Sequence, residues 1–316
     1  MDCPDKNRRY FRIAGITVCL QSDLDFDKVV FRDELLRFSV AGPGNDTVTL
    51  RHRFGLPDVE GMDWGRTVYR RIPWAISRNG GFWYYRGIKS EAPEAELQWL
   101  GIFNENHTSA VIYSEKRLER VVSTGGGWPS LSLFPTDQVW LAPLLADRNA
   151  VLLHSAGAIL NGQGLLFLGH SEAGKSTTAG MLKGRAQILC DDRNVARRWD
   201  GGWRVHGTWS RGDVADVSGS SAPLGAVLWL HQKNCNEIME LKDKKVIWKY
   251  MLGVLVKSVT TAAWWEKEID ILGRLIGEVP CYAMHFDRSG GIVRELENLV
   301  KTLPPPSPFR PGGGCA

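Results

Sequence analysis

The residues best suited to chemistry in this 316-residue chain form one short stretch, in which two glycines precede a lysine and a hydroxyl. Four residues separate Gly169 from Gly174, and Lys175 and Ser176 follow directly. This GxxxxGK[ST] order is typical of a loop whose backbone N–H groups surround a polyphosphate. Glycine permits the backbone torsions, the lysine reaches the β- and γ-phosphates, and the serine hydroxyl binds Mg²⁺.

The stretch also has the flanking elements that such a loop requires. The apolar run 165–168 predicts a buried strand before the loop, and residues 177–182 suit a helix after it, whose positive N-terminal end favours phosphate. The alternative is an ordinary strand–turn–helix with a capping lysine. We expect a site for ATP and Mg²⁺, with another phosphate donor left open. The predicted nucleotide contacts are Gly169, His170, Ser171, Glu172, Ala173, Gly174, Lys175, Ser176 and Thr177.

Two acidic residues follow the next predicted strand. Residues 186–190 (AQILC) predict a strand that ends at Asp191 and Asp192. The carboxyl end of a strand beside the loop strand is where a Mg²⁺ ligand or a general base belongs. The alternative is a simple acidic turn leading into Arg193. We predict that Ser176, Asp191 and Asp192 hold the metal ion, and the choice of base between the two aspartates stays open.

The segments around this stretch predict an α/β domain. Residues 151–160 and a strand from 165 form a hairpin that leads into the loop, and His154 lies in its first strand. A second hairpin covers 195–199 and 203–206. Further predicted elements are a strand at 226–231, helices at 244–258 and 264–276, a strand at 279–286 and a helix at 290–301.

The first part of the chain favours a β-rich domain, because short β-branched and aromatic runs alternate with Gly, Asn, Asp and Pro. The predicted strands are 10–20, 36–40, 47–54, 81–86, 97–103, 109–114 and 117–122. These runs carry no nucleotide or metal signature. His52 and His107 are interpreted as surface residues.

A segment rich in Gly, Ser and Pro, residues 123–135, is the predicted boundary between domains. We therefore expect a β-rich domain at 1–128 and a catalytic α/β domain at 129–303, with a first helix at 136–146. The Pro/Gly tail 304–316 cannot pack a core and is expected to be disordered.

Composition excludes several classes of protein. A net charge of +4 is mild for this length, which fits a nucleotide ligand and does not argue for nucleic acid. Six scattered cysteines without a CxxC pair indicate reduced thiols rather than a disulfide or zinc framework. No apolar signal core and no run of about 18 apolar residues occur, so we expect a cytoplasmic protein without a membrane partner. Whether it forms a homo-oligomer stays open.

Residues 153–286 resemble the catalytic domain of HPr kinase/phosphorylase and its broader relatives, which share a fold with the ATP-dependent phosphoenolpyruvate carboxykinases. The resemblance rests on an ordered set of features: His154 in a strand before a turn, then GHSEAGKST, then Asp191 and Asp192 after the next strand. It implies a P-loop kinase fold in which one aspartate is the base toward a serine hydroxyl and His154 assists it.

The resemblance has one gap. The HPr enzymes carry an EIRGLG signature, of which this chain has no clean copy; this argues against HPr as the substrate and leaves the reverse, phosphorylase reaction open. The nearest segment, 205–213 (VHGTWSRGD), is similar to a GTxWS stretch of kinase-like relatives from peptide biosynthesis clusters, one residue shorter between Thr208 and Trp209. Arg211 is expected to replace the missing arginine and to neutralise charge on the transferring group.

Three functions are compatible with these residues. The first is an ATP-dependent kinase for a serine or threonine hydroxyl of a peptide or small protein, such as a ribosomal peptide precursor. The second is a kinase for a free small molecule such as serine, and the third is a nucleotide-binding scaffold without phosphoryl transfer. The β-rich domain favours the first, because a sheet edge can bind a peptide as an added strand.

Overall fold

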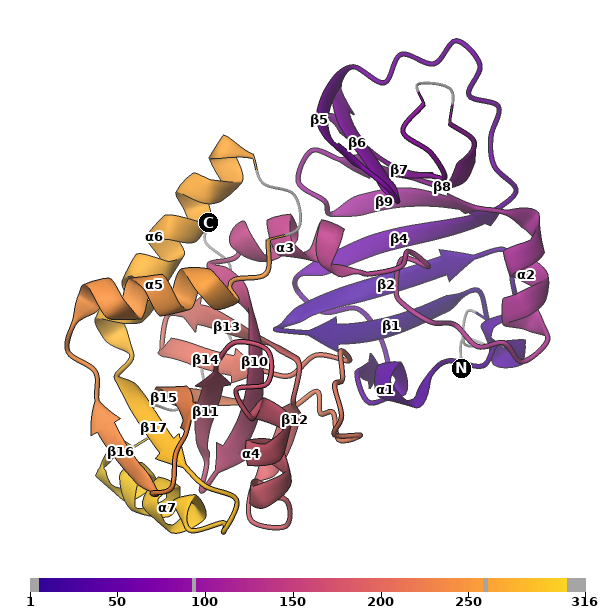
Figure 1. Ribbon diagram of the computed structural model, residues 1–316. Coiled ribbons are helices and arrows are strands. Elements are labelled where there is room, and N and C mark those ends of the chain that lie inside the picture. Colours follow the sequence, from indigo (N-terminus) through magenta and orange to yellow (C-terminus); the bar gives the residue numbers. More distant parts are fainter. Residues whose placement is uncertain (1–5, 93–94, 258–260, 306–316) are drawn as a thin grey trace. The chain divides into compact units, whose positions relative to one another are not determined.

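Two units, each with its own sheet, make up the residues that the computed structural model describes, which are 6–92, 95–257 and 261–305 (Figure 1). Contacts within the chain assign residues up to Leu144 to the first unit and nearly all the residues from Leu145 onward to the second. The chain is therefore a mixed α/β protein with the sheets and helices divided between two units.

The described part of the first unit contains a nine-stranded sheet in the order β3-β1-β2-β4-β9-β8-β7-β6-β5. Its strands are β1 Arg8–Ile13, β2 Ile16–Ser22, β3 Ser39–Val40, β4 Thr47–Phe54, β5 Arg66–Arg71, β6 Trp74–Asn79, β7 Phe82–Ile88, β8 Leu97–Asn104 and β9 Ser109–Ser114. Strands β2, β4 and β9 run parallel, and the other neighbours are antiparallel. The helical elements are η1 Phe26–Lys28, α1 Asp33–Leu36 and α2 Lys116–Ser123.

Aromatic side chains fill the interior of this unit, and two histidines are buried among them. The prediction that His52 and His107 are surface residues is wrong, since both are almost fully buried. His52 Nε2 donates to the Leu131 carbonyl at 2.9 Å, and His107 Nε2 lies 2.7 Å from the Tyr85 hydroxyl. Burial lowers the pKa of each imidazole to about 3. Both imidazole rings are therefore neutral at neutral pH and pack in the interior.

Three predictions in this unit need correction. Residues 117–122 belong to helix α2 rather than to a strand, because Leu118, Val121 and Val122 recur at helical spacing. The run 10–20 is two strands, since positive φ at Ala14 and Gly15 turns the chain back on itself. The run 36–40 ends helix α1 and contributes only the two residues of β3. Strands β5 and β6 have no counterpart among the predicted elements.

The division between the units lies later than the expected boundary after residue 128. The Phe134 ring lies 5.4 Å from that of Trp74, and the Trp140 ring stacks 6.1 Å from Phe103. These aromatic contacts bind the Gly/Ser/Pro-rich segment and the residues after it to the first unit. Helix α3, Gln138–Ala146, therefore begins in the first unit and crosses the division.

The second unit contains an eight-stranded sheet, counted over the described residues, in the order β11-β10-β13-β14-β15-β17-β16, with β12 beside β10. Its strands are β10 Ala150–Leu160, β11 Gln163–Leu168, β12 Gln187–Cys190, β13 Arg193–Trp199, β14 Gly202–His206, β15 Ser221–Gln232, β16 Glu237–Glu240 and β17 Cys281–Phe286. Strand β15 also pairs with β11, and β11, β15 and β17 run parallel. The helices are α4 Lys175–Leu182, α5 Lys244–Val254, α6 Ala262–Glu278 and α7 Ile292–Thr302.

Helices cover both faces of the central parallel strands (Figure 1). All six residues of β11 are buried, and its side chains alternate between the two faces. Leu166 and Leu168 share a core with residues of α5 and α6. Leu165 and Phe167 share the other core with residues of α4 and α7. The strand before the glycine-rich stretch is thus fixed from both sides.

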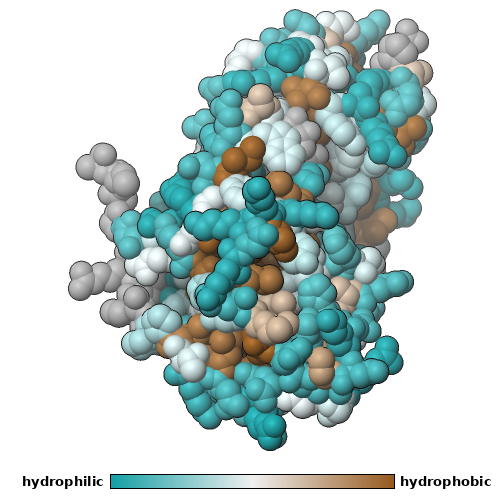
Figure 2. Space-filling model, turned by 60° about the vertical axis from the view of Figure 1, so that its left-hand side comes forward, coloured by the Kyte–Doolittle hydropathy of each residue, from teal (hydrophilic) through white to brown (hydrophobic). Residues whose placement is uncertain are grey.

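The surface exposes apolar side chains in scattered places. Figure 2 draws one face, which is hydrophilic over most of its area with separate hydrophobic patches. The large hydrophobic residues that are exposed come from different elements: Val30, Leu36, Ile72, Phe82, Val121, Met239 and Ile269. Scattered exposure of this kind is normal for folded proteins. None of the helices in residues 6–92, 95–257 and 261–305 is long and apolar enough to cross a membrane.

The predicted disordered tail 304–316 falls mainly outside the described residues, which end at 305. Its first residue is held, because the Pro304 carbonyl accepts a hydrogen bond from Gln163 Nε2 at 2.6 Å. Leu303, just before it, is buried in the core beside α7.

Candidate functional site

The glycine loop, residues 169–174, connects the buried strand β11 to helix α4. Gly174 has a φ of +97°, and a Cβ there would lie 2.6 Å from Phe286 Cζ. At Gly169 a Cβ would lie 2.4 Å from that of Ala173. Both positions therefore require glycine, the first for backbone conformation and space, the second for space alone. The loop ends at the N-terminus of α4, where the helix dipole favours an anion.

Lys175, the first residue of α4, folds its side chain back over the loop. Its Nζ donates to the carbonyl oxygens of Gly169 at 3.0 Å and His170 at 2.9 Å. Burial lowers the pKa of Lys175, and the negative charges of Asp192 and Asp191 oppose this effect. The ammonium group is thus enclosed by the loop and close enough to both aspartates to interact with their charges.

Asp192 lies at the centre of a polar network at the start of β13. Its Oδ1 lies 3.2 Å from His154 Nδ1, and His154 is the cross-strand partner of Arg193. Its Oδ2 accepts a hydrogen bond from the Ser210 hydroxyl at 2.9 Å and forms an ion pair with Arg193 Nη1. Burial acts to raise the pKa of Asp192, but the interactions with His154, Arg193 and Ser210 outweigh it and the pKa is lowered. The carboxylate is therefore ionised at neutral pH.

Asp191, the preceding residue, has a different environment. It is buried, and its two oxygens accept backbone N–H bonds from Gly212 at 2.7 Å and Val214 at 2.9 Å. The carboxylate thus anchors the segment that follows β14. Arg211 is exposed in that same segment, next to the anchored Gly212. The two aspartates that the sequence treats as alternatives therefore differ sharply in their contacts.

The structure brings the predicted residues His154, Lys175, Asp191 and Asp192 into one region of the second unit. Ser176 is half-buried at the start of α4, whereas His170, Ser171, Glu172 and Thr177 are exposed. Hydroxyl and carboxylate oxygens are the ligands that Mg²⁺ prefers, and the Ser176 hydroxyl and the carboxylates of Asp191 and Asp192 offer such oxygens. The ion, the nucleotide contacts and the role of Arg211 stay predictions.

A pocket of about 280 Å³ adjoins the glycine loop. It lies where the parallel strands β15 and β17 end, the edge at which open α/β sheets bind ligands. Gln232 Nε2 donates to the Glu172 carbonyl at 2.7 Å and so joins the pocket to the loop. Its lining consists of Thr177, Gln232, Lys233, Asn234, Phe286, Asp287 and Arg288.

The sequence did not indicate most of the pocket, nor the contacts of Ser210 and Arg193 with Asp192. Apart from Thr177, which is a predicted nucleotide contact on α4, the pocket residues lie at the ends of two separate strands without a recurring pattern, so only the strand ends could have indicated them. Ser210 lies in the predicted GTxWS-like segment but receives no role from the pattern, although it donates to Asp192. Arg193 enters the prediction only as the end of an acidic turn, whereas it forms an ion pair with Asp192.

Comparison with known proteins gives one family. A family model described as SynChlorMet cassette protein ScmC matches residues 140–301, just over half of the chain. No curated protein matches. Among solved structures, the Hpr(Ser) kinase/phosphatase from Coxiella burnetii is similar over 48% of this chain and 88% of that chain, with 11% identity and a TM-score of 0.28. A similarity this weak carries no argument about function.

Proposed function

We propose a function from the premise that the chain belongs to the family described as SynChlorMet cassette protein ScmC. The function is transfer of the γ-phosphate of ATP to a serine or threonine hydroxyl of a peptide or small protein. The observation that carries it is a glycine loop at a helix N-terminus that encloses the Lys175 ammonium, together with an ionised carboxylate, Asp192, whose charge acts on that lysine.

In the proposed reaction the loop and Lys175 bind the β- and γ-phosphates. Mg²⁺, held by Ser176 and Asp191, would neutralise charge on the phosphates. The acceptor hydroxyl oxygen bonds to the γ-phosphorus while Asp192 accepts the hydroxyl proton. The bond between the γ-phosphorus and the bridging β-phosphate oxygen breaks, which releases ADP. The Ser210 hydroxyl already donates to Asp192 Oδ2 at 2.9 Å, so this carboxylate is able to accept a hydrogen bond from a hydroxyl. As a general base it needs the acceptor hydroxyl within about 2.6–3.2 Å.

His154 and Arg193 have positioning roles in this mechanism. Each contacts a different oxygen of Asp192, so the carboxylate is held in one orientation. Asp191 also acts indirectly, because it anchors the segment that contains Arg211. Arg211, exposed in that segment, would neutralise charge on the transferring phosphoryl group.

A peptide acceptor is supported by the first unit. In the described sheet, β5 is an edge strand that pairs only with β6. An unpaired strand edge can bind an extended peptide through main-chain hydrogen bonds. Arg66 and Arg71 are exposed on this strand, which favours a peptide with acidic residues.

The test is phosphorylation of a serine-containing peptide by the full chain with ATP and Mg²⁺, followed by mass spectrometry. We expect Lys175→Ala to weaken ATP binding at least about tenfold, or ~1.4 kcal/mol. We expect Asp192→Asn to bind ATP normally and to lower turnover roughly 10²–10⁴-fold. Lys183→Ala at the far end of α4 and Asp200→Asn in an exposed turn are the matched controls.

A second candidate is a kinase for a free small molecule such as serine, which the pocket beside the loop favours. Phosphorylation of free serine in preference to any peptide would support it. If the Lys175 and Asp192 variants act on every acceptor as fast as the parent protein, neither kinase proposal stands. A nucleotide-binding scaffold would then be the better description.

A further inference from the structure

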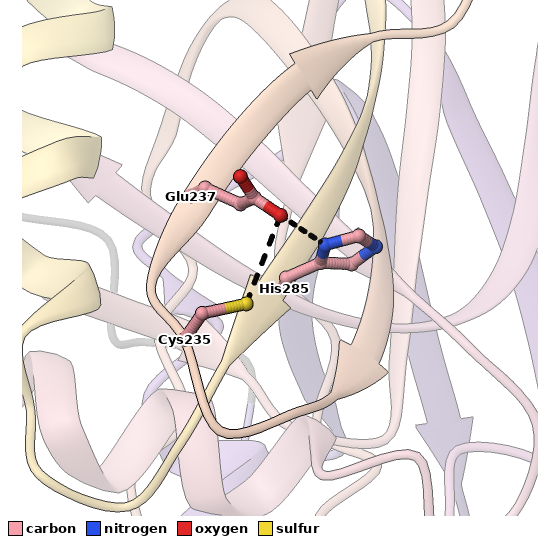
Figure 3. Close-up of side chains that lie close together, drawn as sticks. All are labelled: Cys235, Glu237 and His285. Carbon is pink, nitrogen blue, oxygen red and sulfur yellow. Dashed lines mark hydrogen bonds and ion pairs between the residues drawn. The ribbon is translucent and has the colours of Figure 1, made fainter.

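A thiol, a carboxylate and an imidazole meet at the edge of the second sheet (Figure 3). Cys235 Sγ lies 3.7 Å from Glu237 Oε1, and His285 Nδ1 lies 2.7 Å from the same oxygen. The three donor atoms all lie within 4.8 Å of one another. Donor atoms this close together can bind one metal ion, because the bonds of zinc to S, N and O are about 2.0–2.3 Å long.

The backbone itself brings these side chains together. Glu237 on β16 and His285 on β17 are direct cross-strand partners, and partners project from the same face of a sheet. Cys235 lies in the bend just before β16, and its Sγ reaches the Glu237 carboxylate from there. The intervening Asn236 is fixed by a hydrogen bond to Asp287 Oδ1 at 2.9 Å. The strand pairing and this bond therefore hold the backbone positions from which the three side chains meet.

The arrangement does not suit a thiol nucleophile. A cysteine nucleophile needs the imidazole next to its sulfur, with the carboxylate behind the imidazole. Here the Glu237 carboxylate lies between Cys235 and His285 and contacts both (Figure 3). His285 is therefore not placed to take the thiol proton of Cys235. Three different donors that converge on one point are better explained by a cation.

We propose that Cys235, Glu237 and His285 bind one Zn²⁺ ion. A thiolate, an imidazole and a carboxylate are the ligands that zinc takes in proteins, usually in tetrahedral geometry, which leaves a fourth position for water. Binding releases the thiol proton to water and leaves the ring proton of His285 on Nε2, so that Nδ1 can bind. The hydrogen bond between Glu237 and His285 is then replaced by two bonds to the metal. The ion links the short, largely exposed edge strand β16 to β17.

This zinc site is separate from the proposed Mg²⁺ site. Phe286 faces the glycine loop, since it is the nearest side chain to a Cβ at Gly174. His285, the residue before it on β17, projects from the opposite face of the strand. The ligand sets also differ, because Mg²⁺ takes oxygen ligands and rarely sulfur. Zinc binding is therefore expected without nucleotide.

Titration of the metal-free full chain with Co²⁺ and then Zn²⁺, without nucleotide, tests the proposal. We expect one Co²⁺ per chain with a thiolate-to-cobalt charge-transfer band that Zn²⁺ abolishes by displacement. Cys235→Ser should lose that band. His285→Gln should weaken Zn²⁺ binding by more than the roughly 10–100-fold that loss of a group outside the ligand shell costs.

The control is Glu240→Gln, an exposed acidic residue at the other end of β16, which should bind Zn²⁺ as the parent does. Glu237→Gln gives a second test if either ligand variant fails to fold by circular dichroism. Zinc should also raise the Tm of the parent and of Glu240→Gln, but not that of Cys235→Ser. Unchanged Zn²⁺ affinity in folded Cys235→Ser or Glu237→Gln would overturn the proposal, as would a parent that binds no Co²⁺ or Zn²⁺.

Discussion

Asp191 and Asp192 are neighbours in the chain, yet their oxygens face different partners. Asp191 accepts two backbone N–H bonds, whereas Asp192 contacts the side chains of His154, Arg193 and Ser210. A carboxylate that accepts backbone donors fixes a segment of chain. One that faces side chains can exchange a partner for a substrate group more readily. This difference assigns the base to Asp192 within the proposed kinase reaction.

The assignment predicts opposite phenotypes for the two asparagine variants. Asp191→Asn should lower the free energy of unfolding by roughly 1–3 kcal/mol, because an amide NH₂ next to Gly212 or Val214 leaves a buried donor unpaired. Asp192→Asn should lower turnover while Tm changes little. Thermal unfolding and kcat, measured on both variants, check this. A stable Asp191→Asn beside an unfolded Asp192→Asn would contradict the assignment.

At the scale of elements, the sequence predicts best where a strand and the residues that follow it are contiguous. Strand β11, the glycine loop and α4 follow one another within residues 163–182, so a local pattern is sufficient. Strand β16 is short and mostly exposed, and its partner β17 lies about forty residues later, so no local alternation marks it. The pocket likewise depends on pairing between distant strands, whereas the Ser210–Asp192 bond closes the predicted hairpin of β13 and β14.

Helix α6 contains a buried carboxyl that makes stability depend on pH. Glu268 is almost fully buried, and its Oε2 has no hydrogen-bond partner among the described residues. Burial raises its pKa from 4.5 to about 8. The folded protein therefore holds a proton that the unfolded chain loses at lower pH. Its contribution to stability is complete below pH 4.5 and is lost as the pH rises through about 8.

Glu268→Gln should remove this dependence, because glutamine keeps the shape without the charge. We expect Tm of the parent to fall between pH 5 and pH 9 by more than that of the variant. The free energy of unfolding of the parent should fall by up to about 1.4 kcal/mol per pH unit. Glu266→Gln, exposed on the same helix, should behave as the parent. Parallel pH profiles for parent and Glu268→Gln would show that Glu268 is ionised in the fold.

At the scale of the whole molecule, the two units differ in how far the family match covers them. The match to the ScmC family covers residues 140–301, which is almost entirely the second unit. The nine-stranded sheet of the first unit lies outside that match. A phosphate-transfer site in the second unit needs no such sheet. Under the proposed function, the first unit is therefore the part that selects the acceptor.

This division predicts that changes on the β5 edge alter peptide use without altering nucleotide use. The double variant Arg66→Glu/Arg71→Glu reverses two exposed charges on a strand that pairs only with β6. Exposed charge pairs contribute about 0.2–1 kcal/mol each, so KM for an acidic, serine-containing peptide should rise several-fold. The rise should shrink at high salt, because salt screens exposed charges, while the ATP affinity should equal that of the parent.

Arg117→Glu on helix α2 is the matched control, since it reverses an exposed charge in the same unit but away from the edge strand. It should leave KM for the peptide unchanged. If the double variant and this control give the same KM as the parent, β5 does not bind the peptide. If the double variant also weakens ATP binding, its effect is not confined to acceptor choice. Only a selective, salt-dependent rise in peptide KM agrees with strand addition at β5.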